Sequence, residues 1–188
     1  MKTIAVFCGS SYGRHDIYKE EAKKFGELLA KNNIKLIYGG AKLGLMGKVA
    51  EGVLTNNGYA IGVMPHLLHE REISHTALSE MIMVETMHER KAKMIELADG
   101  FVMLPGGTGT LEEFFEVFTW IQIGLHDKPC GILNTYNYYD PLISFIHKLA
   151  DEKFMNEKYR EMMIVESNPN ILLQRMNQFI SPGIKNYE

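Results

Sequence analysis

The stretch that decides the fold is DGFVMLPGGTGTLEEFFEVF, which runs from Asp99 to Phe118. Its apolar run Phe101–Leu104 has the composition of a buried strand and stops at the glycine turn PGG. A strongly apolar segment of helical length follows, so the stretch predicts a strand, a turn and a helix. Backbone N–H groups at such a helix N-terminus commonly bind phosphate. Two adjacent carboxylates, Glu112 and Glu113, stand close to where an anion is expected, and a function for this chain has to explain them.

Segments of two kinds alternate along the rest of the chain. Short apolar runs predict strands at residues 3–9, 35–40, 60–65, 81–85, 100–105, 129–134 and 163–167. Amphipathic segments predict helices at 16–33, 44–58, 87–99, after the glycine turn, and at 140–154 and 169–180, with a less regular connection at 66–80. This alternation predicts an α/β fold with a parallel sheet covered on both faces. The 188 residues suit a single domain, which we expect over 1–180, with a frayed tail at 181–188.

Composition narrows the functional class. The net charge of −3 gives no electrostatic reason to expect nucleic acid or a membrane as partner. The N-terminal apolar run is too short to span a membrane and is better explained as the first strand. Cys8 and Cys130 lie in strand segments and are expected to be buried free thiols, which suits the cytoplasm. Cys8 also precedes a candidate ligand loop, which leaves its reactivity open.

Ligands of parallel α/β sheets bind beyond the carboxyl ends of the strands. Those ends read CGSSYG, YGGAKLGLMG, MPHLLHE and LPGGTGTLEE, and three of them are glycine-rich. The dinucleotide fingerprint is absent, because Gly9 and Gly13 are wrongly spaced and no acid ends the second strand. The P-loop is absent too, because Lys42 and Val49 occupy two of its required positions. The PGGTGT loop is therefore either a phosphate site of another kind or an ordinary strand-to-helix turn.

Glu113 has two interpretations. With Thr110 it matches a capping box, in which its carboxylate reaches back to the helix N-terminus, and Glu112 is then a solvated acid of the first turn. Alternatively, Glu113 faces a part of the ligand that becomes positive during reaction. A ribose that loses its base does so, because the transition state resembles an oxocarbenium ion.

The predicted helix at 87–99 carries two cations beside its apolar stripe. Met87, Met94 and Ala98 form the stripe, and at ~100° per residue Arg90 and Lys91 flank it on opposite sides. Such cations either extend to solvent or pair with an anion, for which the candidates are a ligand phosphate and Glu113.

The segment Phe114–Leu125 is apolar nearly all round. A small domain covers only part of such a helix, so we expect a partner chain to cover the rest. Thr119 is a polar exception and a candidate ligand contact.

These motifs resemble the lonely-guy (LOG) family of cytokinin riboside 5′-monophosphate phosphoribohydrolases. The family signature P-G-G-x-G-T-x-x-E is complete from Pro105 to Glu113, and its M-x-x-R-K-x-x-M element is complete from Met87 to Met94. The resemblance runs from VFCGSS to the last helix. It implies a Rossmann-like doubly wound fold, a homodimer, and hydrolysis of a nucleoside 5′-monophosphate to a free base and ribose 5-phosphate, with no cofactor or metal.

The resemblance also implies the site. Its catalytic pair falls on Arg90 and Glu113. The substrate contacts it implies are Glu72, Arg90, Lys91, Gly107, Thr108, Gly109, Thr110, Leu111, Glu112, Glu113 and Thr119. Further candidates at the glycine-rich strand ends and the helix start are Gly9, Ser10, Gly39, Gly40 and Met87.

Several alternatives stay open. His66 and His69 do not form a zinc motif, so no metal site is expected. Some relatives carry the label lysine decarboxylase, which nothing in these residues supports. A carrier that binds nucleotides without catalysis would use the same loop, although it would gain little from Glu113. The preferred base, adenine or an N6-substituted adenine, is not determined by the sequence.

Overall fold

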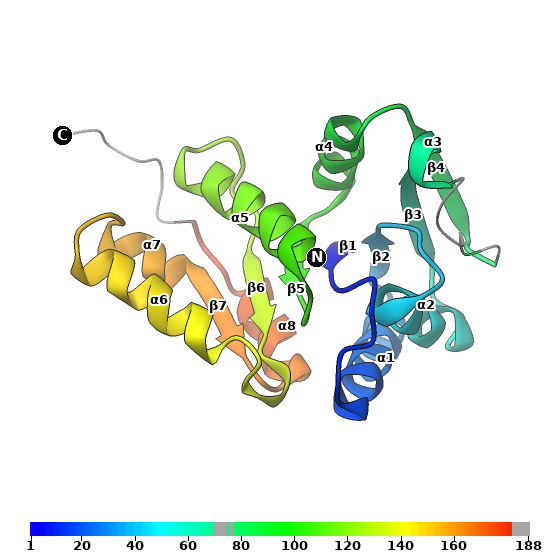
Figure 1. Cartoon of the computed structure of the whole chain (residues 1–188), viewed down its shortest axis with the longest axis horizontal. Coiled ribbons are helices and arrows are strands. Elements are labelled where there is room, and N and C mark those ends of the chain that lie inside the picture. The colour runs from blue at the N-terminus through cyan, green and yellow to red at the C-terminus, as the bar shows by residue number, and fades with distance from the viewer. Residues whose placement is uncertain (70–74, 76, 182–188) are drawn as a thin grey trace.

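A computed structural model describes residues 1–69, 75 and 77–181 (Figure 1). The strands are β1 (Thr3–Phe7), β2 (Lys35–Tyr38), β3 (Ala60–Pro65), β4 (Glu80–Val84), β5 (Gly100–Met103), β6 (Cys130–Leu133) and β7 (Met163–Glu166). They form one sheet in the order β4-β3-β2-β1-β5-β6-β7, and every neighbouring pair is parallel. The predicted α/β fold and all seven predicted strands are confirmed.

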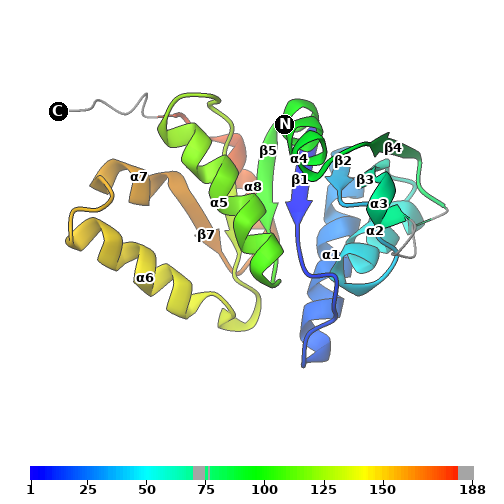
Figure 2. The same cartoon turned by 45° about the horizontal axis from the view of Figure 1, so that its top comes forward.

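Helices cover both faces of this sheet (Figure 2). The helices are α1 (Asp16–Lys31), α2 (Gly44–Thr55), α3 (His66–His69), α4 (Met87–Leu97), α5 (Thr108–Gln122), α6 (Asp140–Asp151), α7 (Glu157–Met162) and α8 (Pro169–Asn177), with a 3₁₀ turn η1 (Thr135–Asn137). One core lies between the sheet and α1, α2 and α8, and a second between the sheet and α4 to α7. In β1, Ile4 and Val6 enter the first core while Ala5 and Phe7 enter the second, as the two-residue strand period requires.

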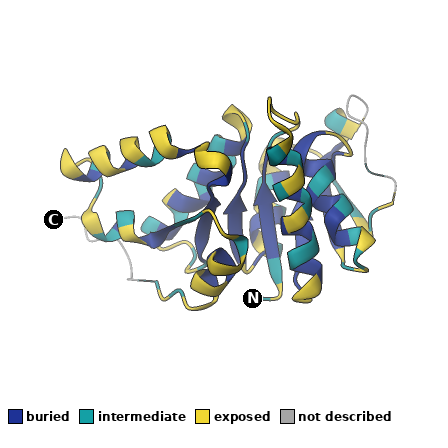
Figure 3. Ribbon diagram, turned by 90° about the horizontal axis from the view of Figure 1, so that it is seen from below, coloured by how far each residue is buried: buried dark blue, intermediate teal, exposed yellow. Residues whose placement is uncertain are grey.

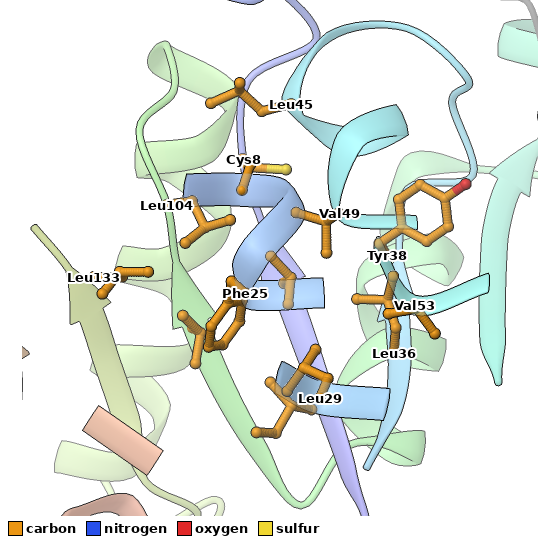
Figure 4. Close-up of a cluster of buried hydrophobic side chains, with 14 of the residues drawn as sticks. Cys8, Phe25, Leu29, Leu36, Tyr38, Leu45, Val49, Val53, Leu104 and Leu133 are labelled. Carbon is orange, nitrogen blue, oxygen red and sulfur yellow. The ribbon is translucent and has the colours of Figure 1, made fainter. Parts of the chain in front are cut away.

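The two cores account for most of the buried surface. In Figure 4, Phe25 and Leu29 of α1 pack with Val49 and Val53 of α2 above the strands. Figure 3 shows buried strands between helices whose outer sides are exposed. Cys8 and Cys130 are buried free thiols, as predicted.

Three helical features differ from the sequence prediction, the first being α3, which lies at the start of the expected less regular connection. The helix after the glycine turn ends at Gln122, so Ile123 and Leu125 lie beyond it. The short helix α7 was not predicted, because Tyr159 and Met162 alone are too few apolar residues to give a periodic pattern. The prediction of one domain over 1–180 stays a prediction, and 182–188 of the predicted tail lie outside the described residues.

The sheet places a binding edge next to β1. Successive strands run from β1 through β2 to β4 on one side, and from β5 to β7 on the other. The loops after β1 and β5 therefore leave the sheet edge in different directions and open a crevice between them, which is where such folds bind ligands.

Candidate active site

Three glycine-rich strand ends are joined by backbone hydrogen bonds at this edge. The N–H of Gly9, after β1, donates to the carbonyl of Pro105, after β5, at 3.0 Å. The N–H of Leu45, at the start of α2, donates to the carbonyl of Gly9, also at 3.0 Å. The three glycine-rich strand ends that the sequence showed therefore lie together in one site.

A pocket of about 290 Å³ opens among these loops and α4. Its predicted lining residues are Gly9, Ser10, Gly39, Met87, Arg90, Gly107, Thr108, Gly109, Thr110, Glu112 and Glu113. Val6, Cys8 and Met46 also line it and were not predicted as contacts. Sequence reasoning found the glycine loops and the charged residues, but strand and helix positions such as Val6 and Met46 look like ordinary core residues.

The N-terminus of α5 faces this pocket. Its N-cap is Gly107, which has no side chain to cap the helix, so the amides of the first turn are available to a ligand. A methyl group placed on Gly107 or Gly109 would meet nothing within 4 Å, so the backbone there is open to close approach. A phosphate fits this loop, because the amides and the helix dipole favour an anion.

The capping-box interpretation of Glu113 is wrong. The helix begins at Thr108 and its N-cap is Gly107, so Thr110 and Glu113 both lie inside it. Glu113 is therefore one turn too far along to bond the first amides. Glu112 is likewise not an acid of the first turn, although it is solvent-exposed as that interpretation expected, and its carboxylate pairs with Lys91 of α4.

Arg90 and Glu113 meet inside the pocket. Arg90 Nη2 lies 3.8 Å from Glu113 Oε1, and the two side chains are only 9% and 13% exposed. The buried Nε of Arg90 has no hydrogen-bond partner, and its Nη1 contacts the sulfur of Met87 at 3.8 Å. A buried guanidinium normally satisfies its donors, so this arrangement leaves donors free for a ligand oxygen.

Burial is the main cause of the pKa shifts of two groups that line the pocket, Glu113 and Cys8. Burial raises the pKa of Glu113 above its usual value, with Glu112 and Glu116 adding to the rise and Arg90 and Lys91 opposing it. A carboxylate with a raised pKa can accept a proton more readily near neutral pH. Burial also raises the pKa of Cys8, further raised by Glu113, so the Cys8 thiol stays protonated and is a poor nucleophile.

Lys91 points to α5 rather than into the pocket. Its Nζ lies 2.5 Å from Glu112 Oε1 and 3.2 Å from Glu116 Oε2. Burial lowers the pKa of Lys91, but its interactions with the carboxylates of Glu112 and Glu116 outweigh this and the net pKa is raised. The cation therefore ties α4 to α5 beside the Arg90–Glu113 pair.

The remaining predicted residues fall in different places. Met87 was expected in the buried stripe of its helix and is instead 42% exposed at the pocket, whereas Met94 and Ala98 are buried. Gly40, Leu111 and Thr119 do not line the pocket, and Thr119 is exposed on α5. Glu72 lies outside the described residues. The roles of these residues stay predictions.

Two tyrosines that sequence reasoning missed donate hydrogen bonds to the backbone of the turn between β5 and α5. The Tyr139 hydroxyl donates to the carbonyl of Leu104, and the Tyr138 hydroxyl donates to the carbonyl of Gly106, both at 2.8 Å. They follow β6 in the stretch NTYNYYDP, whose polar and aromatic residues at a strand end were the available signal. These bonds fix the turn before α5.

Neither a metal centre nor a membrane span emerges from the structure. Among the residues that it describes, no three His, Cys, Asp or Glu side chains gather closely enough to hold a metal ion. His66 lies 3.8 Å from Glu85 instead. Within the same ranges, every helix is too short or too polar to cross a membrane.

Known proteins resemble this chain over nearly its whole length. A family model described as "Possible lysine decarboxylase" matches residues 46–176. "Probable cytokinin riboside 5′-monophosphate phosphoribohydrolase LOGL2" of Oryza sativa subsp. japonica is 43% identical over 178 residues, which are 95% of this chain and 73% of that protein. "Cytokinin riboside 5′-monophosphate phosphoribohydrolase LOG1" of Arabidopsis thaliana is 42% identical over 179 residues, covering 95% and 84% of the two chains. The chain belongs to the LOG family.

A solved structure agrees with this LOG assignment at the level of fold. The molybdenum cofactor binding protein from Rippkaea orientalis superimposes with a TM-score of 0.70 over 94% of this chain and 95% of that chain, at 19% identity. At that identity the likeness concerns the architecture alone. The resemblance inferred from the PGGTGT loop and the Arg90-Lys91 element is confirmed.

Proposed function

We propose that this LOG protein hydrolyses the N-glycosidic bond of purine nucleoside 5′-monophosphates, of the cytokinin or adenosine type. The observation that carries the proposal is the buried Arg90–Glu113 pair beside the uncapped N-terminus of α5. The relatives named above are phosphoribohydrolases, which supports the same reaction. A carrier would need the phosphate loop but not a buried carboxylate with a raised pKa.

The loop and the pair have separate tasks. The amides of Gly107 to Thr110 hold the 5′-phosphate, and this remote binding energy lowers the barrier at the ribose. Glu113 faces the sugar, where its negative charge stabilises the oxocarbenium-like transition state. Arg90 orients Glu113 and donates to a ligand oxygen through its unpaired N–H groups.

The reaction consumes one water molecule. The water oxygen bonds to C1′ of the ribose while the bond from C1′ to the base nitrogen breaks. The electron pair of that bond leaves with the base, which gains a proton from solvent. Glu113 accepts the proton that the attacking water loses. The products are a free base and ribose 5-phosphate.

The test is incubation of the purified protein with a panel of nucleoside 5′-monophosphates and the matching nucleosides, with chromatography for free base. We expect base from the monophosphates, and far less from the nucleosides, which lack the phosphate that the loop holds. Binding of the monophosphates without any base would favour the carrier.

We also propose that the protein is a cytoplasmic homodimer. Leu125 and Ile123 after α5 are 64% and 38% exposed, and Phe145 of α6 and Phe154 after it are 56% and 85% exposed. Exposed apolar side chains of this size are favourable in a subunit interface and a liability in water. Light scattering is the direct test of this assembly.

A further inference from the structure

Gly39 lies directly after β2, with its Cα against the guanidinium of Arg90. A methyl group placed on Gly39 would overlap Nη2 of Arg90 and would lie 3.2 Å from its Cζ. The same methyl group would lie 2.9 Å from the sulfur of Met46. The guanidinium thus occupies the space that any side chain at position 39 would need.

The backbone does not require a glycine at this position. The positive-φ glycines of the described chain include Gly40, with φ of 82°, but not Gly39. Alanine is therefore compatible with the local conformation, and the two groups that it would meet are the ends of flexible side chains. We expect Gly39→Ala to fold and to displace Arg90 rather than the strand.

Arg90 has few other contacts that fix its position. Its guanidinium lies 3.8 Å from the Glu113 carboxylate and 3.8 Å from the sulfur of Met87, which are long distances for hydrogen bonds. Its Nε has no partner. Because these contacts are too long to be directional hydrogen bonds, the shape of the wall at Gly39 determines where the guanidinium can lie.

We propose that Gly39 is a positioning residue, which acts on the reaction through Arg90 by leaving a space that the guanidinium fills. The expected effect on kcat/KM rests on the proposed function. A displacement on the scale of 1 Å can lower a catalytic rate about 10²-fold. Gly39→Ala is therefore expected to lower kcat/KM about 10²-fold while Arg90 itself remains in the chain.

The experiment is a double-variant cycle of Gly39→Ala, Arg90→Ala and the two together. The matched control is Gly100→Ala at the start of β5, where the new methyl group would meet the flexible ends of Met1 and Met176 and would lie 3.3 Å from the ring of Pro129. We expect the control to keep wild-type activity. With Arg90 already removed, Gly39→Ala should change kcat/KM by less than about threefold, because coupled residues are not additive.

Two results would overturn the proposal. One is a Gly39→Ala protein with kcat/KM within about threefold of wild type. The other is that Gly39→Ala lowers kcat/KM as much in the Arg90→Ala protein as in the wild type, which would make Gly39 a direct ligand contact or a structural residue. Thermal unfolding of each variant accompanies the kinetics.

A second readout separates this proposal from the proposed function. The same cycle is measured as the dissociation constant of a C-nucleoside 5′-monophosphate, whose carbon–carbon glycosidic bond cannot be hydrolysed. If the wild-type protein releases no base, the proposed hydrolysis fails, but the binding cycle still tests Gly39. If Gly39→Ala lowers affinity in the wild type but not in the Arg90→Ala protein, the positioning role is supported. If the two substitutions lower affinity additively, it is contradicted.

Discussion

Replacing Glu113 by glutamine should remove most of the activity and leave the fold intact. The substitution keeps the size of the side chain and removes its negative charge. If that charge stabilises the transition state or accepts the proton of water, kcat should fall by roughly 10²–10⁴-fold, which is about 3–5 kcal/mol on the barrier. Affinity for an unreactive nucleotide should change far less, because the proposed phosphate contacts are the amides at the α5 N-terminus and not Glu113.

The structure also gives the sign of the effect on stability. At 3.8 Å and an effective dielectric near 20, Arg90 attracts the Glu113 charge by about 4 kcal/mol. The pKa of Glu113 is nevertheless raised, so burial and the neighbouring carboxylates outweigh this attraction. The folded state therefore favours the neutral side chain, which glutamine resembles. We expect the free energy of unfolding at pH 7 to stay unchanged or to rise.

The assay compares kcat, the dissociation constant of a C-nucleoside 5′-monophosphate, and Tm. Glu96→Gln is the control, because Glu96 is an exposed residue of α4 whose carboxylate pairs with Lys93 at the surface. The control should match the wild type in all three measurements. Turnover at the wild-type rate in Glu113→Gln would refute the catalytic assignment. Loss of activity together with a large drop in Tm would refute the electrostatic reasoning, since it would show that the charge supports the fold.

Five further results are expected. Nucleosides should be much poorer substrates than their 5′-monophosphates in steady-state assays, and equal kcat/KM values would contradict the role of the loop. The activity should rise as pH increases through the raised pKa of Glu113. Glu112→Gln should shift this rise to lower pH, because the Glu112 charge raises the pKa of Glu113. A pH–activity profile that Glu112→Gln leaves unchanged would argue that another group causes the rise. Protonation of Glu113 stabilises the folded state, fully below its usual pKa near 4.5, and this stabilisation is lost as pH rises through its pKa in the folded protein. The free energy of unfolding of Glu113→Gln should therefore lack this part of the pH dependence. Light scattering should give a dimer at micromolar concentration that Leu125→Glu weakens, whereas a stable wild-type monomer would rule the dimer out. Arg90→Lys should lose most of the activity, since a lysine cannot reproduce bidentate contacts, and near-normal kcat would reduce Arg90 to a simple point charge.

The sequence predicted the sheet well because each strand is a short apolar run between clear turn signals. The glycine loop was also predictable, since the glycines around the start of α5, Gly107 and Gly109, stand between a strand pattern and a helix pattern and need no information from distant parts of the chain. The start of α5 was less certain: the capping-box pattern at Thr110 competed with the true N-cap at Gly107, and only the backbone decides between them.

Long-range contacts set the limit of prediction. Pairing of Lys91 with Glu112 and Glu116 depends on how α4 packs against α5, which the helical period of one segment does not contain. The periodicity likewise placed Met87 in a buried stripe, although it lies at the first turn of α4, where the pocket opens. The contribution of Tyr138 required the loop after β6 to reach the loop after β5.

The most direct test of the hydrolysis is a single turnover with the protein in excess over adenosine 5′-monophosphate. At a protein concentration well above the dissociation constant nearly all the nucleotide is bound, and the quenched mixture is separated to quantify nucleotide, base and sugar phosphate. Hydrolysis at the Arg90–Glu113 site predicts complete conversion to equal amounts of adenine and ribose 5-phosphate. Recovery of the bound nucleotide intact, with neither product formed, would contradict it.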